Sequence, residues 1–390
     1  MKKGWQTTTL GDTCEMYQPK TISGKEMVAD GAYVVFGANG VIGRYDKFNH
    51  EEPQLLITCR GATCGSVNMS EPNSWITGNA MVVRPKDGAI ELSFLEYLFR
   101  GGIDIARAIT GAAQPQITRT NLAPLDISYP VSLGEQQRIV GILDEAFEGI
   151  ATAKANAEKN LQNAHALFES HLQSVFTQRG EGWVAKSVGE LVAEGALVKP
   201  FDGNHGEIHP RKADYTQSGV PFIMACDLKN GTVDTQQCTF ISRKLSDSLR
   251  VGFAKDGDVL ISHKGTIGRS AIVSTDDEYI MLTPQVTSYR VKDVGKLFNR
   301  FIRYYFMSPV FQREMIAGAA DGSTRAYIGI TKQLTLRFRF PPLAEQKRIA
   351  AELDILDPET QRLATIYERK LAALDDLKKS LLHQAFSGQL

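Results

Sequence analysis

Apolar side chains recur at steps of three and four residues along two stretches of this chain, Glu135–Phe176 and Glu345–Phe386. This spacing predicts amphipathic helices. The apolar stripe is narrow, of the kind that packs against one partner helix rather than across a broad core. In the first stretch it consists of Ile139, Leu143, Phe147, Ile150, Leu161, Ala164, Phe168, Leu172 and Val175. Each stretch is therefore expected to form a long helix that pairs with another.

The two stretches are copies of one another. A constant offset of 345 − 135 = 210 residues aligns them without a gap. Glu135, Gln136, Arg138, Ile139, Leu161, Leu172 and Phe176 return as Glu345, Gln346, Arg348, Ile349, Leu371, Leu382 and Phe386. A gapless match of this length indicates an internal repeat. The chain therefore consists of two halves, each a globular segment followed by a helical one.

Pro358 interrupts the second helical stretch. Asp357 followed by Pro358 is typical of a helix N-cap with proline at the first helical position. We therefore predict a short helix that ends near Leu356 and a new helix from Pro358 to Phe386. The alternative is a single helix that is kinked at Pro358. The expected seam of the new helix is Leu363, Leu371, Leu374, Leu377 and Leu381.

The segments before the helices have a different pattern. Short apolar runs at Tyr33–Phe36, Leu55–Thr58 and Ala80–Val83 lie between Gly, Pro and Asn residues, as buried strands do. Leu92–Arg100 is expected to be a short helix, and Leu125–Tyr129 a closing strand. Residues 179 to 340 repeat this plan. Leu56-Ile57-Thr58-Cys59-Arg60-Gly61 corresponds to Leu260-Ile261-Ser262-His263-Lys264-Gly265, and Phe301–Met307 parallels the Leu92 helix.

Composition narrows the class of protein. A chain of 390 residues, with 43% hydrophobic and 23% charged residues, fits a soluble protein of two to four domains. Neither a signal-peptide pattern nor a long apolar run is present, so a cytoplasmic protein is expected. Five scattered cysteines without a Cys-x-x-Cys pair argue against a disulfide framework or a zinc site. The formal charge of zero counts against a compact nucleic-acid-binding domain, although residues 323–348 are locally basic.

Catalytic motifs are missing from the sequence. It contains no phosphate-binding Gly-x4-Gly-Lys-Ser/Thr loop, and the Pro-Pro pair after Phe340 is not the tetrapeptide of amino-methyltransferases. Pro358-Glu359 with a later Glu-Arg-Lys loosely matches a nuclease pattern, but a solvated helix face explains it better. His205 and His209 lie in a Gly/Pro loop without further ligands, so we expect no metal there. The chain is expected to be non-catalytic.

A role in binding another molecule is the function that remains after catalysis is set aside. Two basic-Gly turns follow strands and free backbone N–H groups beside a cation, which suits phosphate oxygens. Polar loops near the end of each globular segment carry side chains of the kind that contact base edges. Taken singly, each such residue could belong to an ordinary solvated loop. The candidate DNA-binding residues are Arg60, Gln114, Gln116, Thr118 and Arg119 in the first half, and Lys264, Thr266, Arg269, Arg325, Tyr327 and Lys332 in the second.

The chain resembles the specificity subunits of Type I restriction–modification systems. The resemblance is carried by Pro130–Ile139 and Pro341–Ile349, which both lead into Glu-Gln-x-Arg-Ile, and it covers the full length. It is also carried by Gly111–Thr118 and by the ending Leu382–Leu390. The second half departs from the pattern, because Gly322-Ser323-Thr324-Arg325 lacks the Gln-Pro of the first.

This resemblance implies an α+β fold. Two mixed α/β target recognition domains are joined by two long helices that form an antiparallel coiled coil, in a pseudo-twofold repeat. The expected boundaries are 1–132 for the first recognition domain, 133–178 for the first spacer helix, 179–340 for the second recognition domain and 341–390 for the second spacer. Each domain would read one half of an asymmetric bipartite DNA site. A helix of about 29 residues spans roughly 43 Å, which would place the half-sites on the order of one DNA turn apart.

The resemblance also implies partners. Two modification subunits would dock on the repeated helices and carry S-adenosylmethionine, while restriction subunits would use ATP and Mg for translocation and cleavage. The expected spacer and docking residues are the seven repeated pairs from Glu135 and Glu345 to Phe176 and Phe386. The rival hypotheses are a coiled-coil scaffold whose globular ends bind proteins and a self-sufficient enzyme. Salt-dependent DNA binding would distinguish the specificity subunit from the scaffold.

Overall fold

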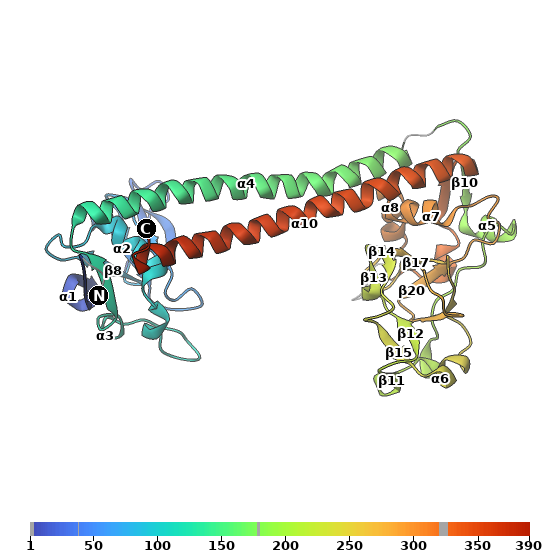
Figure 1. Ribbon diagram of the computed structural model, residues 1–390, viewed down its shortest axis with the longest axis horizontal. Helices are drawn as coiled ribbons and strands as arrows, with labels where there is room; N and C mark the ends of the chain where they lie inside the picture. Colours follow the sequence, from blue (N-terminus) through green and yellow to red (C-terminus); the bar gives the residue numbers. More distant parts are fainter. Residues whose placement is uncertain (1–3, 38, 178–179, 320–326) are drawn as a thin grey trace. The chain divides into compact units, whose positions relative to one another are not determined.

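The computed structural model describes residues 4–37, 39–177, 180–319 and 327–390 (Figure 1). The chain folds as two compact units. Unit 1 consists of Met1–Glu158 and Glu368–Leu390, and unit 2 consists of Lys159–Tyr367. Each unit therefore takes in parts of both long helices, whereas the predicted boundaries give each helix a segment of its own.

Unit 1 combines three small sheets with short helices. Strand β1 (Trp5–Thr9) pairs antiparallel with β9 (Asp126–Pro130). The four-stranded sheet has the order β2 (Cys14–Tyr17), β8 (Ala80–Pro85), β5 (Leu55–Thr58) and β6 (Val67–Met69). The three-stranded sheet has the order β4 (Gly40–Tyr45), β3 (Tyr33–Gly37) and β7 (Trp75–Ile76). The short helices include α1 (Leu10–Thr13), α2 (Leu92–Tyr97), which continues as a π-turn over Leu98–Gly102, and α3 (Arg119–Leu122).

Unit 2 repeats this plan with larger sheets. Strand β10 (Val184–Ser187) pairs antiparallel with β21 (Arg337–Phe340), as β1 pairs with β9. One five-stranded sheet has the order β11 (Tyr215–Thr216), β15 (Thr239–Ile241), β12 (Val220–Ile223), β19 (Ile280–Leu282) and β16 (Phe253–Ala254). The other has the order β13 (Leu228–Lys229), β14 (Gly231–Val233), β18 (Ser270–Ile272), β17 (Val259–Ser262) and β20 (Val286–Tyr289). Its helices include α5 (Val188–Ala193), α6 (Arg243–Asp247), α7 (Asn299–Met307), α8 (Pro309–Gly318) and α9 (Ile330–Gln333).

The long helices α4 (Leu133–Thr177) and α10 (Leu343–Ser387) contribute to both cores. The core of unit 1 contains Ile139 and Leu143 from the start of α4 and Leu382 and Ala385 from the end of α10. The opposite ends of the two helices contribute to the core of unit 2. The end of α4 supplies Phe168, Leu172 and Phe176, and the start of α10 supplies Ile349, Ala350 and Leu353. The apolar stripe of α4 is therefore confirmed, but both of its ends pack into globular cores and not only against one partner helix as predicted.

The two helices run antiparallel where they meet within each unit (Figure 1). In unit 1, Lys154 Nζ of α4 lies 2.7 Å from Asp375 Oδ1 of α10. In unit 2, His171 Nε2 of α4 lies 3.2 Å from Glu352 Oε1 of α10. The predicted fold class, two mixed α/β domains with long antiparallel helices, is confirmed. Within the described ranges, none of the helices has both the length and the apolar character of a membrane span.

The predicted helix break at Pro358 is wrong. Helix α10 is one element, with Pro358 in its interior. The carboxylate of Asp357 does not cap a new helix, because it forms a buried ion pair with Arg303 of α7 at 2.8 Å. Leu353, before the proline, packs in the core of unit 2, and Ala364, after it, is also buried. Tertiary packing thus outweighs the cost of proline in a helix interior, which is about 3 kcal/mol.

The predicted seam of the second helix is wrong at Leu377. This side chain is 46% exposed. The next residue, Lys378, is also exposed but contacts α4, because its Nζ lies 4.9 Å from the ring centroid of Phe147. A lysine stem covers apolar surface while its ammonium stays near water. The spacing of apolar residues predicted the helix correctly but placed Leu377 on the wrong face of it.

Candidate nucleic-acid interface

The first basic-Gly turn lies beside the predicted polar loop. Strand β5 ends at Thr58, and the exposed Arg60 pairs with Gln116 in an isolated antiparallel bridge. The backbone N–H of Ile117 donates to Cys59 O at 2.9 Å, and that of Gly61 donates to Pro115 O at 3.1 Å. The structure therefore brings Arg60 and Gln116, which are far apart in the sequence, to one edge of unit 1.

The other candidates of the first half lie close along the chain to this bridge. Gln114, Thr118 and Arg119 are exposed. The Thr118 hydroxyl caps α3 and accepts a hydrogen bond from the backbone N–H of Asn121 at 3.3 Å. Arg119 is the first residue of that helical turn. Thr118 therefore has a local structural role, whereas Arg60, Gln114, Gln116 and Arg119 present exposed donors.

The second basic-Gly turn has the same construction. Lys264 follows strand β17 and pairs with Tyr327 in an isolated antiparallel bridge. The backbone N–H of Ile328 donates to His263 O at 3.1 Å, which matches the bond between Ile117 and Cys59. Lys264 Nζ lies 5.8 Å from the Tyr327 ring centroid, within cation–π range. Both units therefore present an exposed cation next to a polar or aromatic side chain at a strand end.

The remaining candidates of unit 2 are dispersed around this edge. Thr266 and Arg269 are exposed in the turn between β17 and β18, and the Arg269 backbone N–H donates to Ser262 Oγ at 2.9 Å. Lys332 is exposed on α9. Arg325 lies outside the described residues, as do the neighbouring Ser323 and Thr324. The roles of all the candidate residues in both units as DNA contacts stay predictions.

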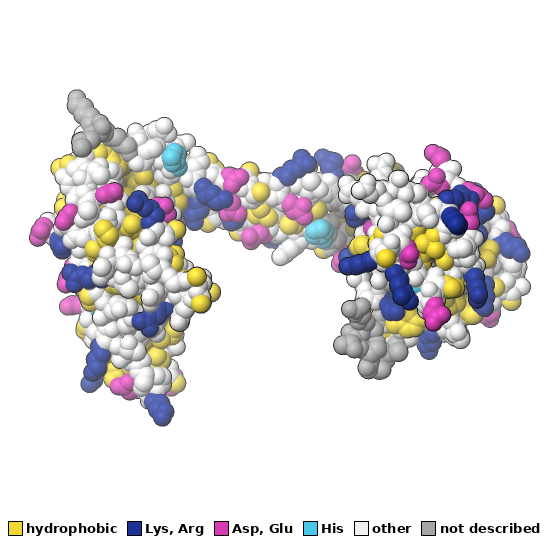
Figure 2. Space-filling model, turned by 90° about the horizontal axis from the view of Figure 1, so that it is seen from below, with side chains coloured by type: hydrophobic (Ala, Val, Ile, Leu, Met, Phe, Trp, Pro, Cys, Tyr) yellow, Lys and Arg dark blue, Asp and Glu magenta, His cyan; other side chains and the backbone are white. Residues whose placement is uncertain are grey.

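Charge is mixed on the surface of the molecule. On the face shown in Figure 2, dark blue Lys and Arg side chains are interspersed with magenta Asp and Glu rather than joined in one basic stripe. This agrees with equal numbers of basic and acidic residues, 44 of each. Non-specific attraction to a DNA backbone depends on clustered positive charge. Geometry at the two bridged edges, rather than bulk charge, is thus the feature that points to recognition.

The repeated glutamines anchor the long helices. Gln136 is fully buried, donates through Nε2 to Pro130 O at 2.8 Å and to Ala89 O at 3.0 Å, and accepts from Glu91 N at 2.8 Å. Gln346 repeats all three hydrogen bonds in unit 2, with Pro341 O, Lys296 O and Phe298 N at 2.9, 2.9 and 3.0 Å. All three polar functions of each amide are satisfied. These two side chains therefore fix the helix starts and are not available as surface contacts.

The other repeated residues divide into an exposed pair and a buried set. Arg138 forms a two-bond ion pair with Glu135 at 2.8 Å, and Arg348 forms the same pair with Glu345 at 2.8 and 2.9 Å. These exposed side chains remain candidates for partner docking. The packed residues of the set are Ile139, Ile349, Leu172, Leu382, Phe176 and Phe386, with Leu161 and Leu371 half-buried.

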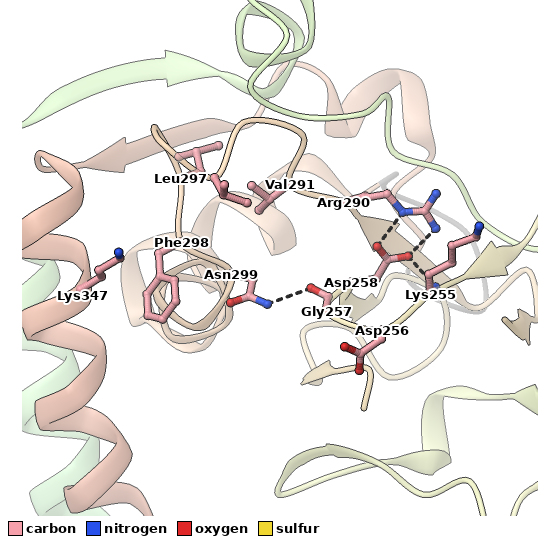
Figure 3. Close-up of a pocket in the computed structure, with 11 residues that line it drawn as sticks. Lys255, Asp256, Gly257, Asp258, Arg290, Val291, Leu297, Phe298, Asn299 and Lys347 are labelled. Carbon is pink, nitrogen blue, oxygen red and sulfur yellow. Dashed lines mark hydrogen bonds and ion pairs between the residues drawn. The ribbon is translucent and has the colours of Figure 1, made fainter. Parts of the chain in front are cut away.

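A cleft of about 520 Å³ lies beside the start of α10 in unit 2 (Figure 3). Its floor carries Arg290, which pairs with the buried Asp258 at 2.7 Å, and Asn299, which donates to Gly257 O at 3.0 Å. Unit 1 has the corresponding arrangement, because Arg84 Nε donates to Gln54 Oε1 at 3.1 Å. Arg290 and Asp258 satisfy each other, so this ion pair has a structural role at the cleft.

Groups with catalytic potential are not assembled. His205 Nε2 lies 2.9 Å from Asp202 Oδ2, and across the described residues no group of three or more His, Cys, Asp or Glu side chains is arranged to hold a metal ion. Burial raises the pKa of the Cys14 thiol to about 11 and also raises the pKa of Cys59, which leaves both thiols protonated near neutral pH. Glu359 of the nuclease-like pattern is exposed on α10 and pairs with Arg362 at 3.0 Å.

A buried polar network behind Lys264, which includes His263, Thr287 and Gln333, was not predicted from the sequence. Two of these polar residues lie in or directly after apolar strand runs. Polar residues within or next to an apolar strand are the sequence signal that points to such a network. Periodicity alone could not reveal it, because the partners come from three separate segments.

A sequence model of one family, the Type I restriction modification DNA specificity domain, matches residues 2–162 and 201–368. The chain belongs to this family. The two matches cover most of both globular segments and part of each long helix. The family domain therefore occurs twice, once in each half of the repeat. Both bridged edges, at Arg60 and at Lys264, fall inside the matched ranges.

Individual relatives agree with the family assignment. The MjaVIII specificity subunit of a Type I restriction enzyme from Methanocaldococcus jannaschii is 20% identical over 99% of this chain and 93% of its own length. The EcoBI specificity subunit from Escherichia coli is 24% identical, but over 48% of this chain and 38% of that protein. The second match therefore spans well under half of that relative.

Solved structures share the fold. A chain from a structure on complex assembly and conformational transition of the type I R-M system has a TM-score of 0.74 and 18% identity, over 100% of this chain and 99% of the other. The HsdS subunit from Thermoanaerobacter tengcongensis has a TM-score of 0.58, also at 18% identity, over 100% of this chain and 98% of the other. At this level of identity the likeness establishes the fold.

Proposed function

We propose that this chain is the DNA-recognition subunit of a Type I restriction–modification complex, in which each unit reads one half of an asymmetric bipartite site. One observation carries the proposal within a member of this family. The edge made by Arg60 and Gln116 in unit 1 is built like the edge made by Lys264 and Tyr327 in unit 2. The two edges have the same backbone hydrogen-bonding pattern but carry different side chains. Two domains that read different half-sites require this difference.

The catalytic steps belong, on this proposal, to partner subunits. Modification subunits would carry S-adenosylmethionine and transfer the methyl group, and restriction subunits would use ATP and Mg. The membership of the chain in a family of DNA specificity domains supports this division. A cytoplasmic location, where restriction and modification act on chromosomal and incoming DNA, is part of the same proposal. The free cysteines suit a reducing compartment.

The docking surface for the modification subunits is proposed to lie on exposed apolar positions of the helices. On α10, Ile355, Ile366 and Leu377 are 70%, 44% and 46% exposed. Ile355 and Ile366, which both belong to unit 2, lie eleven residues apart, or about three helical turns, so they share one side of the helix. Leu167, the repeat equivalent of Leu377, is 52% exposed on α4. Exposed rows of large apolar side chains are typical of protein contacts, and repeat-equivalent leucines suit two copies of one partner.

The experiment that tests this function measures DNA binding by the chain with and without its host's modification subunits. With the partner present, affinity for host DNA fragments should depend on sequence and fall steeply with salt, since phosphate contacts release counterions. A scaffold that binds only proteins would show no salt-dependent DNA affinity in either state. Methylation or cleavage of DNA by the purified chain alone would establish the rival enzyme instead.

A further inference from the structure

A buried chain of hydrogen bonds lies directly behind the Lys264–Tyr327 edge. The hydroxyl of Tyr289 donates to Gln333 Oε1 at 2.8 Å, and Gln333 Nε2 donates to Thr287 Oγ1 at 3.0 Å and to Ile328 O at 2.9 Å. Thr287 Oγ1 lies 2.7 Å from Nδ1 of His263. The four side chains of this network (His263, Thr287, Tyr289 and Gln333) are all fully buried.

These bonds fit a neutral His263 in which Nδ1 accepts a hydrogen bond. Thr287 accepts from Gln333, so its own hydroxyl hydrogen is available to donate to His263 Nδ1. The imidazole is then neutral and carries its proton on Nε2, 3.6 Å from Asp202 Oδ2. Burial lowers the pKa of His263 to about 4, in agreement with a neutral ring. The hydrogen bonds thus run from Tyr289 to Nδ1 of the imidazole, whereas Nε2 has no hydrogen-bond partner among the described residues.

Unit 1 places apolar residues at the same four positions. The pairing of β5 with β8 matches that of β17 with β20, so Met81 corresponds to Thr287 and Val83 to Tyr289. The matching bonds from Ile117 and Ile328 identify Cys59 with His263. The matching turns of α3 and α9 identify Leu122 with Gln333. The unit 1 residues Cys59, Met81, Val83 and Leu122 are all buried in its core.

This comparison shows that the backbone bridge itself does not need the network. Unit 1 forms the same bridge over an apolar layer, and an apolar layer avoids the desolvation of polar groups. The network includes or bonds to the chain neighbours of Lys264 and Tyr327. His263, which precedes Lys264, is part of it, and Ile328, which follows Tyr327, accepts a hydrogen bond from it. The hydrogen bonds of a buried network restrict the positions of the groups that they join.

We propose that His263, Thr287, Tyr289 and Gln333 form a positioning network that fixes Lys264 and Tyr327 for recognition of one DNA half-site. The inference rests on the proposed function, because it names residues that set the specificity of unit 2. The four residues do not contact DNA themselves. They determine where the exposed lysine and tyrosine lie, and unit 1 performs the same task with apolar packing.

The test uses the full chain in complex with its modification subunits, and DNA duplexes that are altered in one half-site at a time. Gln333→Leu, which introduces the residue found at position 122, removes the centre of the network. Discrimination against duplexes altered in the half-site of unit 2 should fall about tenfold, the scale of one base contact. Discrimination at the other half-site should stay within about twofold, a change small beside the cost of one mismatched base pair.

Two further variants separate positioning from stability. The triple variant Thr287→Val, Tyr289→Phe and Gln333→Leu removes most donors and acceptors together, so its unfolding midpoint should exceed that of Gln333→Leu. Its discrimination at the half-site of unit 2 should stay low. The control Ser246→Ala removes a buried hydrogen bond to Tyr279 of 2.8 Å in another cluster of unit 2, and should leave discrimination unchanged.

The outcomes distinguish the two proposals. If discrimination by the triple variant recovers together with its unfolding midpoint, or if both half-sites weaken alike in Gln333→Leu, the network is structural only and the inference is overturned. If discrimination by Gln333→Leu is unchanged, the inference is likewise overturned while the proposed function stands. If the unaltered complex does not discriminate at either half-site, the proposed function itself fails.

Discussion

The guanidinium of Arg303 lies 2.8 Å from the carboxylate of Asp357, and the two side chains are only 8% and 7% exposed. This pair joins α7 to α10 one residue before Pro358, where sequence patterns predict a helix start. It has no counterpart in unit 1, because the repeat equivalent of Asp357 is Phe147, which packs against Tyr97 at a ring-centroid distance of 5.5 Å. The same position thus connects helix and globular part by charge in one unit and by aromatic packing in the other.

Asp357→Ala should destabilise the protein by about 3 kcal/mol, because it leaves a buried guanidinium without its counter-charge. Urea unfolding monitored by circular dichroism measures the change. The matched control is Asp376→Ala on the same helix, which removes an ion pair with Lys379 whose two side chains are both 77% exposed. That control should change stability by less than about 0.5 kcal/mol. Equal effects of the two substitutions would contradict a structural role for the buried pair.

Gln136→Leu should loosen the start of α4, because one buried and two partly buried backbone groups lose their partners at once. We expect a loss of about 2–3 kcal/mol and faster proteolysis near residue 133. The control is Gln137→Leu, since the adjacent side chain is exposed. Gln346→Leu should have the same effect at the start of α10. A neutral outcome at Gln136 and Gln346 would show that the repeated amides are not the anchors.

How far the fold follows from the sequence differs between features. The strands at Tyr33, Leu55 and Ala80 and the stripe of α4 follow from local spacing, because burial there depends on periodicity along one element. The continuity of α10 through Pro358 does not, since it involves the ion pair of Asp357 with Arg303, and these two residues lie 54 positions apart in the sequence.

The candidate site shows the same division. The strand-plus-glycine pattern identified both edges, whereas the bridge partners and the network at Gln333 arise from tertiary pairing. The equivalence of Cys59 with His263 becomes visible only when the two units are compared bond by bond. Side-chain contacts between distant segments are therefore the part that sequence patterns did not supply.

Leu167→Glu and Leu377→Glu should each weaken the binding of one modification subunit, because a charge replaces an exposed apolar contact at repeat-equivalent positions. The double variant should lose both copies, which native mass spectrometry of the complex would count. The matched controls are Gln162→Glu and Ala372→Glu, which are also repeat equivalents, are exposed and lie on other sides of their helices. Unchanged stoichiometry in the double variant would remove the docking role from these leucines.

The stability of unit 2 should depend on pH through His263. Burial lowers its pKa from 6.5 to about 4 against the opposing attraction of Asp202, and His205 and Lys264 add to the lowering. The unfolded chain takes up a proton near pH 6.5, while the folded ring stays neutral until about pH 4. The contribution of this group is therefore complete above pH 6.5 and is lost as the pH falls from 6.5 toward 4.

This loss should reach up to about 3 kcal/mol at the acid end of the range, at about 1.4 kcal/mol for each unit of pKa shift. Urea unfolding at a series of pH values measures it. In His263→Gln the slope between pH 4 and 6.5 should flatten, whereas the exposed His383→Gln should retain it. A slope that is identical in His263→Gln would assign the pH dependence to other groups.

Sequencing of the methylated bases in the host genome tests most directly whether the chain is a two-part reader of DNA. With the chain present, methylation should occupy one motif of two defined parts separated by a fixed gap, and it should disappear when the chain is deleted. Replacement of residues 1–132 by the corresponding segment of another family member should change only one part of the motif. Methylation that persists without the chain, or a replacement that changes both parts, would contradict the assignment of one half-site to each unit.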